Sequence, residues 1–356
     1  MIGRTHSAII EVLTPLWRRV LRRPQISVDD DFFDQGGNAS LAAELLAEVG
    51  PVGGRHLRPT AICKAPTIRT MAALLGEPPT ASVWPLVQLK PGAERPPVFI
   101  AHGIGGSIID FVPLARRIQV RRPIYGMQVR GIDGDEEPLE RVEDMAQYYL
   151  EAIKRLQPDG PYFLIGYSLG GQVVLEMAQR LCAKGDTVSL LAIIDSYPHS
   201  ANLPPRQRLA SFLRRAGGRL QDLRKLPMRE SISRLVHRVS RKAQTSNGRR
   251  LTPHIRRSIA SANLAWTRYQ PRFYRGRIDF IRAKTVTYFS PEPAAVWGEL
   301  ASEFECETVP GDHVGMITNH VDSLAAALSR RLQEALRREH EFSGMNDRWS
   351  QMQRRA

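Results

Sequence analysis

The segment that most constrains the fold is an apolar run ending in a Gly-x-Ser-x-Gly turn, within residues 163–171. The apolar residues before the turn predict a buried strand, and the apolar spacing over 172–178 predicts a helix. A sharp turn from strand to helix strains its central residue, which exposes Ser168 Oγ at the carboxyl edge of a sheet. Glycine is expected at 166 and 170 because a side chain there would collide with the neighbouring strand or helix. An ordinary tight turn is the alternative, but the flanking strand and helix patterns favour a nucleophilic serine.

Short apolar runs alternate with amphipathic stretches through the rest of this region. Such alternation predicts an α/β fold with a mainly parallel, doubly wound sheet. The runs predict strands over 98–101, 124–129, 163–167, 189–194, 277–281 and 304–309, and helices over about 142–156 and 321–339.

Two further side chains are expected beside Ser168. Asp195 directly follows a buried strand, and His313 lies in a loop after the last strand. The carboxyl ends of parallel strands open on the same edge, where ligands gather. The chain order Ser, Asp, His is that of α/β-hydrolases. Asp279 lies inside a strand rather than at its end, so Asp195 is the preferred acid of a Ser168, His313 and Asp195 triad.

A glycine-rich loop, residues 102–107, follows the strand expected at 98–101. In α/β-hydrolases one oxyanion donor is the N–H after the nucleophile, here Leu169, and another comes from such a loop, where Ile104 is the best candidate. A phosphate-binding loop is the competing interpretation, but no Gly-Lys-Ser/Thr follows. His102 is expected to be a hydrogen-bonded support rather than a base.

Residues 199–262 interrupt the alternation with helical segments and hold the basic excess of the chain. The net charge is +14, and residues 201–260 contain 16 Lys/Arg against 2 Asp/Glu, which leaves 34 against 34 elsewhere. Without stacking aromatics or a nucleic-acid motif, this distribution favours a basic lid or docking surface over nucleic-acid binding. A solvated basic excursion without a partner remains the alternative.

Composition narrows the setting of the chain. No apolar run reaches the roughly 18 residues that a membrane span needs, and no secretory signal is found at the amino terminus. The 3 cysteines lie far apart without metal-ligand spacing, so reduced thiols, a cytoplasmic location and no metal site are expected.

The first eighty residues resemble another kind of module. Asp34-Gln35-Gly36-Gly37, followed by Ala65-Pro66-Thr67-Ile68, resembles the carrier domains of nonribosomal peptide and polyketide assembly lines. The resemblance implies a small all-α bundle over 1–78. The proline-rich composition of the residues that follow indicates a linker over 79–96 that leads into an edge strand. The family's phosphopantetheine-bearing serine falls on Ala39, which has no hydroxyl. Ser40, turned by about 100° on a helix, is a weak alternative. No covalently bound cofactor is therefore expected.

The later motifs resemble the thioesterase domains that end such assembly lines. Gly166-Tyr167-Ser168-Leu169-Gly170-Gly171, an acid one strand later at Asp195, and Gly311-Asp312-His313 carry the resemblance. It implies an α/β-hydrolase fold over 97–340, in which the helical insert at about 199–262 is the lid. The polar residues after the last helix predict a flexible tail over 341–356.

The resemblance also implies an activity. A serine thioesterase of this kind releases an acyl, polyketide or peptidyl chain from a phosphopantetheinyl carrier, here one on a partner carrier or synthase module. Hydrolysis and cyclisation both stay open, because pocket shape decides between them. The alternatives are a carboxylesterase acting on small esters and a non-enzymatic docking protein with a relic triad.

Overall fold

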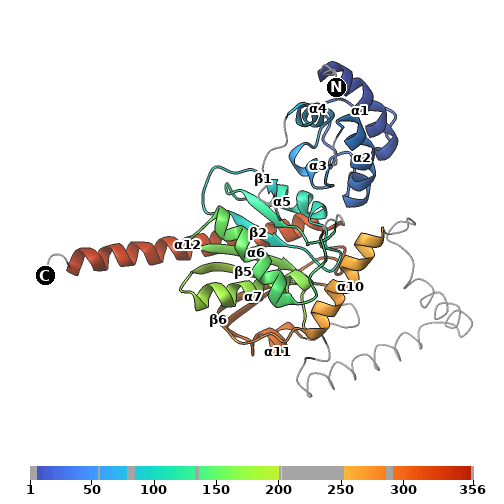
Figure 1. Cartoon of the computed structure of the whole chain (residues 1–356). Coiled ribbons are helices and arrows are strands. Elements are labelled where there is room, and N and C mark those ends of the chain that lie inside the picture. The colour runs from blue at the N-terminus through green and yellow to red at the C-terminus, as the bar shows by residue number, and fades with distance from the viewer. Residues whose placement is uncertain are drawn as a thin grey trace, which may run out of the picture.

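The computed structural model describes residues 6–54, 57–77, 85–132, 136–199, 202, 252–285 and 292–353, with 342–353 as backbone only. A group of N-terminal helices precedes a seven-stranded sheet with helices on both faces (Figure 1). The N-terminal helices are α1 (His6–Leu21), α2 (Ala39–Val52), α3 (Ala61–Lys64) and α4 (Ile68–Gly76). The strands are β1 (Leu86–Lys90), β2 (Val98–Ala101), β3 (Ile124–Met127), β4 (Tyr162–Tyr167), β5 (Val188–Ile194), β6 (Tyr274–Ala283) and β7 (Ala301–Val309). The remaining helices are η1 (Ile109–Phe111), α5 (Val112–Arg117), α6 (Val142–Leu156), α7 (Leu169–Ala183), α10 (Pro253–Arg268), α11 (Pro293–Trp297) and α12 (Val321–Gln353).

The N-terminal helices form a small bundle around their own apolar side chains. Apolar residues at helical spacing place Leu13, Trp17 and Val20 on one buried face of α1. Helix α4 begins with a capping box between Thr67 and Thr70, which satisfies N–H groups that the first turn leaves open. The all-α bundle predicted from the carrier resemblance is confirmed.

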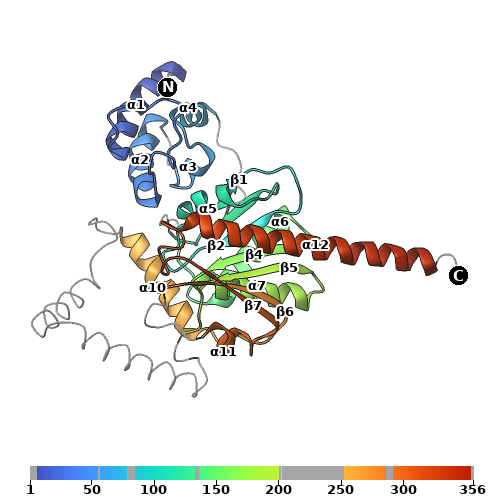
Figure 2. The same ribbon diagram turned by 180° about the vertical axis from the view of Figure 1, so that it is seen from behind.

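The sheet has the order β1-β3-β2-β4-β5-β6-β7, and only β1 runs antiparallel to its neighbour among the described strands. Helices α5 and α12 cover one face, and α6 and α7 cover the other (Figures 1 and 2). The β4 strand is central and buried along its whole length, so its carboxyl end lies at the middle of the sheet edge. The predicted parallel α/β sheet is confirmed.

Two elements, a strand and a helix, extend beyond the predicted limits. The expected edge strand is β1, and it lies inside the segment predicted to be linker, because Leu86 and Leu89 are buried against the rest of the sheet. The last helix was expected to end near 339 but continues to Gln353, since residues 340–353 contain no proline and only one glycine, Gly344. Most of the predicted lid lies outside the described residues, and α10 belongs to its end.

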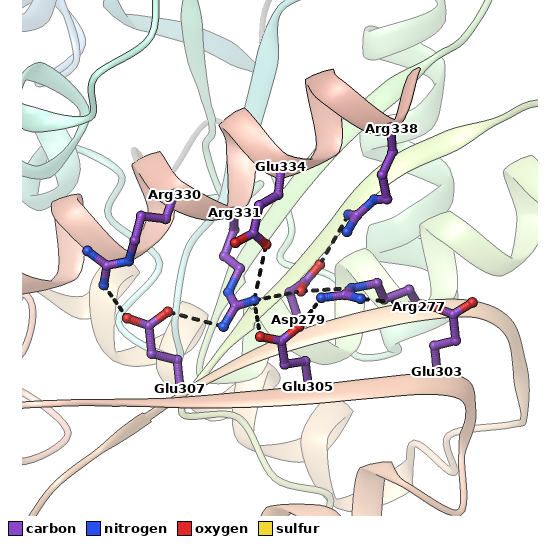
Figure 3. Close-up of polar contacts among 9 residues, drawn as sticks. All are labelled: Arg277, Asp279, Glu303, Glu305, Glu307, Arg330, Arg331, Glu334 and Arg338. Atoms are coloured by element: carbon purple, nitrogen blue, oxygen red, sulfur yellow. Dashed lines mark hydrogen bonds and ion pairs between the residues drawn. The ribbon is translucent and has the colours of Figure 1, made fainter. Parts of the chain in front are cut away.

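Helix α12 is tied to the two outermost strands by a network of ion pairs (Figure 3). The side chain of Arg331, a residue of α12, extends toward the strands and bridges Asp279 of β6 and Glu305 of β7. Burial raises the pKa of Asp279, and the Arg277 guanidinium beside it opposes that rise. The charged residues of the network on β7, the edge strand, also disfavour pairing of this strand with another chain. The members of the network are Arg277, Asp279, Glu303, Glu305, Glu307, Arg330, Arg331, Glu334 and Arg338.

None of the helices in the described part of the chain has both the length and the apolar character needed to span a bilayer.

Candidate active site

Ser168 occupies the turn between β4 and α7. Its backbone has φ +54° and ψ −123°, and a residue with a side chain rarely adopts a positive φ. The Ser168 N–H donates to the Ile194 carbonyl at 2.9 Å, which holds the turn against the end of β5. The strain predicted for this position is therefore present, and the side chain is half-buried at the carboxyl edge of the sheet.

The glycines on either side of Ser168 allow close packing. A Cβ at Gly166 would lie 2.3 Å from the Gly170 carbonyl oxygen, and one at Gly170 would lie 2.5 Å from the His102 carbonyl oxygen. Both distances are far shorter than a van der Waals contact, so the collisions expected from the sequence are confirmed. The start of α7 consequently lies directly against the end of β2.

Asp195 and His313 are brought together at the same edge. The His313 Nδ1 donates to Asp195 Oδ2 at 2.7 Å, and Asp195 Oδ1 lies 3.4 Å from the Ala283 N–H that donates to it. The Asp195 side chain is 7% exposed, whereas that of His313 is 32% exposed. Since the carboxylate can only accept, Nδ1 carries a proton and Nε2 is the ring nitrogen left for other partners.

Tyr167, the residue before Ser168, holds His313 from the other side. Its hydroxyl donates to the His313 carbonyl at 2.6 Å, and the two rings stack with centroids 4.8 Å apart. Burial raises the pKa of Tyr167, so the hydroxyl stays protonated as a donor. The loop itself is tightened by Asp312, whose Oδ1 accepts from the Gly315 N–H at 2.7 Å.

Sequence reasoning missed this role of Tyr167. The available signal was its place one residue before Ser168, at the end of the strand that leads into the Ser168 turn, the nucleophile elbow. No hydrogen bond joins Ser168 to His313 among the contacts of the described residues, so Tyr167 provides the connection between them. Hydrogen bonds of this kind are often long or misaligned in a site without substrate.

The glycine-rich loop lies against the elbow. A Cβ on Gly103 would be 3.3 Å from Ser168 Cβ, so the loop backbone passes close to the nucleophile. Ile104 follows on this loop and is half-buried, while Leu169 is buried at the first position of α7. The first N–H groups of a helix have no partner within the helix, which leaves Leu169 N–H open to an incoming oxygen. The oxyanion roles of Ile104 and Leu169 stay predictions.

His102 supports this loop from beneath. Its Nδ1 donates to the Gly103 carbonyl at 2.6 Å, and its Nε2 accepts from the Tyr149 hydroxyl at 2.7 Å. Complete burial lowers the pKa of His102 to about 4, and the hydrogen bond to Gly103 opposes that change only in part. The ring is therefore neutral near pH 7, as expected of a support rather than a base. Tyr149, its partner on α6, was not anticipated from the sequence.

The two candidate attachment residues open the second N-terminal helix. Asn38 caps α2 by accepting from the Leu41 N–H, Ala39 is the first helical residue, and Ser40 is exposed. The Ala39 methyl offers no atom to which phosphopantetheine could be joined, so the residue at the family's attachment position does not fit that group. Histidine, cysteine and acidic side chains form no cluster of three able to hold a metal within the described ranges.

Comparisons with protein families match both parts of the chain. The thioesterase-domain family model matches residues 96–332, and the model of the phosphopantetheine attachment site matches residues 11–75. The second match indicates phosphopantetheine as the group on which substrate is carried.

One relative is a dimodular nonribosomal peptide synthase of Bacillus subtilis (strain 168). It is 31% identical over 295 residues, which are 81% of this chain and 12% of the relative. The chain therefore spans about an eighth of that relative's length.

Solved structures share the fold. A four-domain nonribosomal peptide synthetase bound to AMP and glycine aligns with 90% of this chain and 26% of its own, at 22% identity and a TM-score of 0.55. The NocB thioesterase domain in covalent complex with a fluorophosphonate nocardicin G analogue aligns with 69% of this chain and 99% of its own. That alignment has 24% identity and a TM-score of 0.51.

Proposed function

The chain belongs to the thioesterase-domain family, and from that premise we propose that it releases an acyl, polyketide or peptidyl chain from a phosphopantetheinyl carrier through Ser168, His313 and Asp195. The observation that carries the proposal is the 2.7 Å hydrogen bond from His313 to Asp195 beside a serine held at positive φ. A serine hydroxyl needs an adjacent base to become nucleophilic, and that base needs a partner for the charge it acquires.

The reaction begins with acyl transfer to the enzyme. Ser168 Oγ attacks the thioester carbonyl while His313 Nε2 takes the hydroxyl proton, and Asp195 stabilises the imidazolium that results. The Leu169 and Ile104 N–H groups donate to the oxyanion, a contribution typically worth about 3–4 kcal/mol for each donor. The carbon–sulfur bond then breaks, and the thiol leaves with the proton from His313.

The second half releases the product. His313 accepts a proton from water, or from a hydroxyl or amine within the acyl chain, and that nucleophile attacks the acyl group on Ser168. Collapse of the intermediate returns the proton to Ser168 Oγ. Water gives a free acid, whereas an internal nucleophile gives a ring. Because Ala39 lacks a hydroxyl, we propose that the thioester substrate arrives on a partner carrier.

Thiol release tests this function. We expect the wild-type chain to release thiol from acyl-pantetheine thioesters faster than alcohol from the matching oxygen esters. Ser168→Ala should reduce thiol release by about 10⁴-fold or more. A preference for oxygen esters would instead support a carboxylesterase. Release that persists in Ser168→Ala would exclude Ser168 as nucleophile.

Fluorophosphonate labelling separates an idle enzyme from a non-enzymatic docking protein. The expected product is one adduct on Ser168, found by peptide mass mapping and absent from Ser168→Ala. An unlabelled wild-type chain that also leaves every thioester intact would support the docking protein.

A further inference from the structure

The part of the N-terminal bundle that carries the carrier signature faces the α/β region. The Ala39 N–H donates to Asp110 Oδ1 at 3.0 Å, although the two residues lie 71 positions apart. Asp31 and Arg116 form an ion pair at 2.9 Å, and the Arg116 guanidinium lies 5.2 Å from the centroid of the Phe33 ring. The turn that precedes α2 is thus fixed to the segment spanning η1 and α5 (Figures 1 and 2).

This segment leads directly to the candidate active site. Asp110 belongs to η1, which follows the glycine-rich loop beside Ser168. The next residue, Phe111, packs edge-on against the Tyr167 ring with centroids 5.6 Å apart, and Tyr167 stacks on His313. The attachment position of the bundle and the candidate base are therefore joined by a short series of contacts through η1.

The contact between the two regions also has an apolar part. Buried side chains of the bundle are continuous with those beneath α5 and α12, and α3 packs against β1. Cys63 of α3 packs against the apolar core that the two regions share. Burial raises the pKa of its thiol to about 12, and Arg116 and Asp110 are the charged groups that act on it most.

We propose that the N-terminal bundle occupies the surface of the α/β region on which a loaded partner carrier docks, and that it must move away before the partner's substrate reaches Ser168. The inference rests on the proposed function. The bundle matches the phosphopantetheine attachment-site family and presents the attachment end of α2 toward the active site. With alanine at position 39 it delivers nothing itself, so while docked it excludes a carrier that delivers substrate.

Competition of this kind has a measurable signature. A partner binds only the fraction of molecules whose surface is free, so weakening the internal contacts raises its apparent affinity by the change in that fraction. A small thioester that diffuses to Ser168 without docking gains nothing from the same change. Comparing a free substrate with a carrier-borne one therefore isolates the docking step from the chemistry.

Asp31 is the residue to change because it pairs with Arg116 from the bundle side and leaves the docking surface intact. Asp31→Lys in the full chain should raise kcat/KM on an acylated, separately produced carrier domain about three- to tenfold. It should leave thiol release from acyl-pantetheine unchanged. Asp31→Asn removes the charge but keeps an oxygen that accepts from the Phe33 N–H, so the turn should still fold. It should raise kcat/KM on the carrier-borne substrate less than Asp31→Lys does.

Asp29→Lys is the matched control, since Asp29 pairs with Arg69 inside the bundle at an exposed position. It should change neither rate. An Asp31→Lys effect equal to that of Asp29→Lys, or a fall in carrier-borne turnover, would overturn the proposal. Failure of the proposed function is distinguishable, because it would abolish Ser168-dependent release of free acyl-pantetheine in the wild type as well.

Cys63 reports the movement directly. Maleimide labelling of Cys63 should be faster in Asp31→Lys than in wild type, with the exposed Cys182 and Cys306 as references within the same molecule. A rise in carrier-borne turnover without faster Cys63 labelling would refute displacement of the bundle as its cause.

Discussion

The N-terminal bundle and the α/β region each present one position on a turn held by glycines, at the start of a helix. In the bundle, Gly36 has φ +92°, and a Cβ on Gly37 would lie 2.2 Å from the Phe32 ring. In the α/β region, Gly166 and Gly170 are packed as tightly around Ser168. Only the second turn carries a hydroxyl at the presented position. A turn held by glycines at the start of a helix can thus contact another part of the molecule without presenting a hydroxyl.

The sharpest way to break this comparison is to return a hydroxyl to the bundle. Ala39→Ser should become fully modified when incubated with coenzyme A and a phosphopantetheinyl transferase, whereas the wild type stays unmodified. The reason is that residue 39 occupies the attachment position, while Ser40 is rotated by about 100° on α2. Intact-protein mass before and after incubation is the measurement.

Ser40→Ala serves as the control in both backgrounds. It should leave the wild-type mass unchanged and should not prevent modification of Ala39→Ser. A mass gain in the wild type that Ser40→Ala removes would show that the bundle is an active carrier and that its motif is only shifted.

The second prediction compares two buried aspartates of adjacent strands. Asp195→Asn should lower kcat about 10³- to 10⁴-fold, because an amide cannot stabilise the imidazolium and favours the wrong tautomer of His313. Asp279→Asn should leave kcat within about twofold, since Asp279 pairs with arginines of β6 and α12 on the outer part of the sheet (Figure 3).

Thiol release and urea unfolding should be measured on both variants. For Asp195→Asn we expect lost activity and a free energy of unfolding close to that of the wild type. For Asp279→Asn we expect retained activity and a lower free energy of unfolding. Equal activity losses in the two would mean that Asp195 acts only through folding.

Sequence patterns predicted the features that depend on neighbouring residues. The strands, the elbow and the order of Ser168, Asp195 and His313 follow from apolar runs and local turns, and the contact between Asp195 and His313 follows from parallel strands sharing one edge. The catalytic roles themselves stay predictions, as do the domain boundaries.

Other features depend on side chains that the sequence separates widely. The hydrogen bond from Tyr149 to His102 spans 47 positions, and the ion pair between Asp31 and Arg116 spans 85. Neither has a local signature, because an isolated tyrosine or arginine on a helix is compatible with an exposed face as well as with a partner. The length of α12 was missed for a different reason, since its end projects beyond the sheet (Figures 1 and 2) and lacks the packing pattern on which the prediction relied.

The third prediction concerns the buried support of the active site. The pKa of His102 is lowered to about 4, so between pH 6.5 and 4 the unfolded chain binds a proton at this residue that the folded chain does not. The stability contributed by neutral His102 is therefore complete above pH 6.5 and declines as the pH falls toward 4. At pH 4.5 the loss should be about 2–3 kcal/mol in the free energy of unfolding.

His102→Gln removes the titrating group but keeps one donor and one acceptor for Gly103 and Tyr149. Urea unfolding at pH 7.5 and 4.5 should show a smaller loss on acidification in this variant than in the wild type. If both lose the same free energy, His102 is already charged in the folded protein or reaches solvent.

The smallest effect is expected at Tyr167 and tests whether the α/β region keeps supporting contacts as well as reactive groups. Tyr167→Phe removes the hydrogen bond to the His313 carbonyl but keeps the stacked ring, so His313 should lose orientation rather than position. Loss of one hydrogen bond worth about 1 kcal/mol should lower kcat about three- to tenfold with little change in KM. Tyr162→Phe is the control at the opposite end of β4, where the Tyr162 hydroxyl lies 3.0 Å from the Pro158 carbonyl oxygen and 3.1 Å from the Gln157 carbonyl oxygen and donates to them. Both variants remove one tyrosine hydroxyl donor from the same strand, so a loss of stability is expected from each. Only Tyr167→Phe should slow thiol release, because only that hydroxyl holds the loop carrying the candidate base. An equal fall in kcat for Tyr162→Phe would mean that the strand as a whole, rather than its carboxyl end, sets the geometry at Ser168.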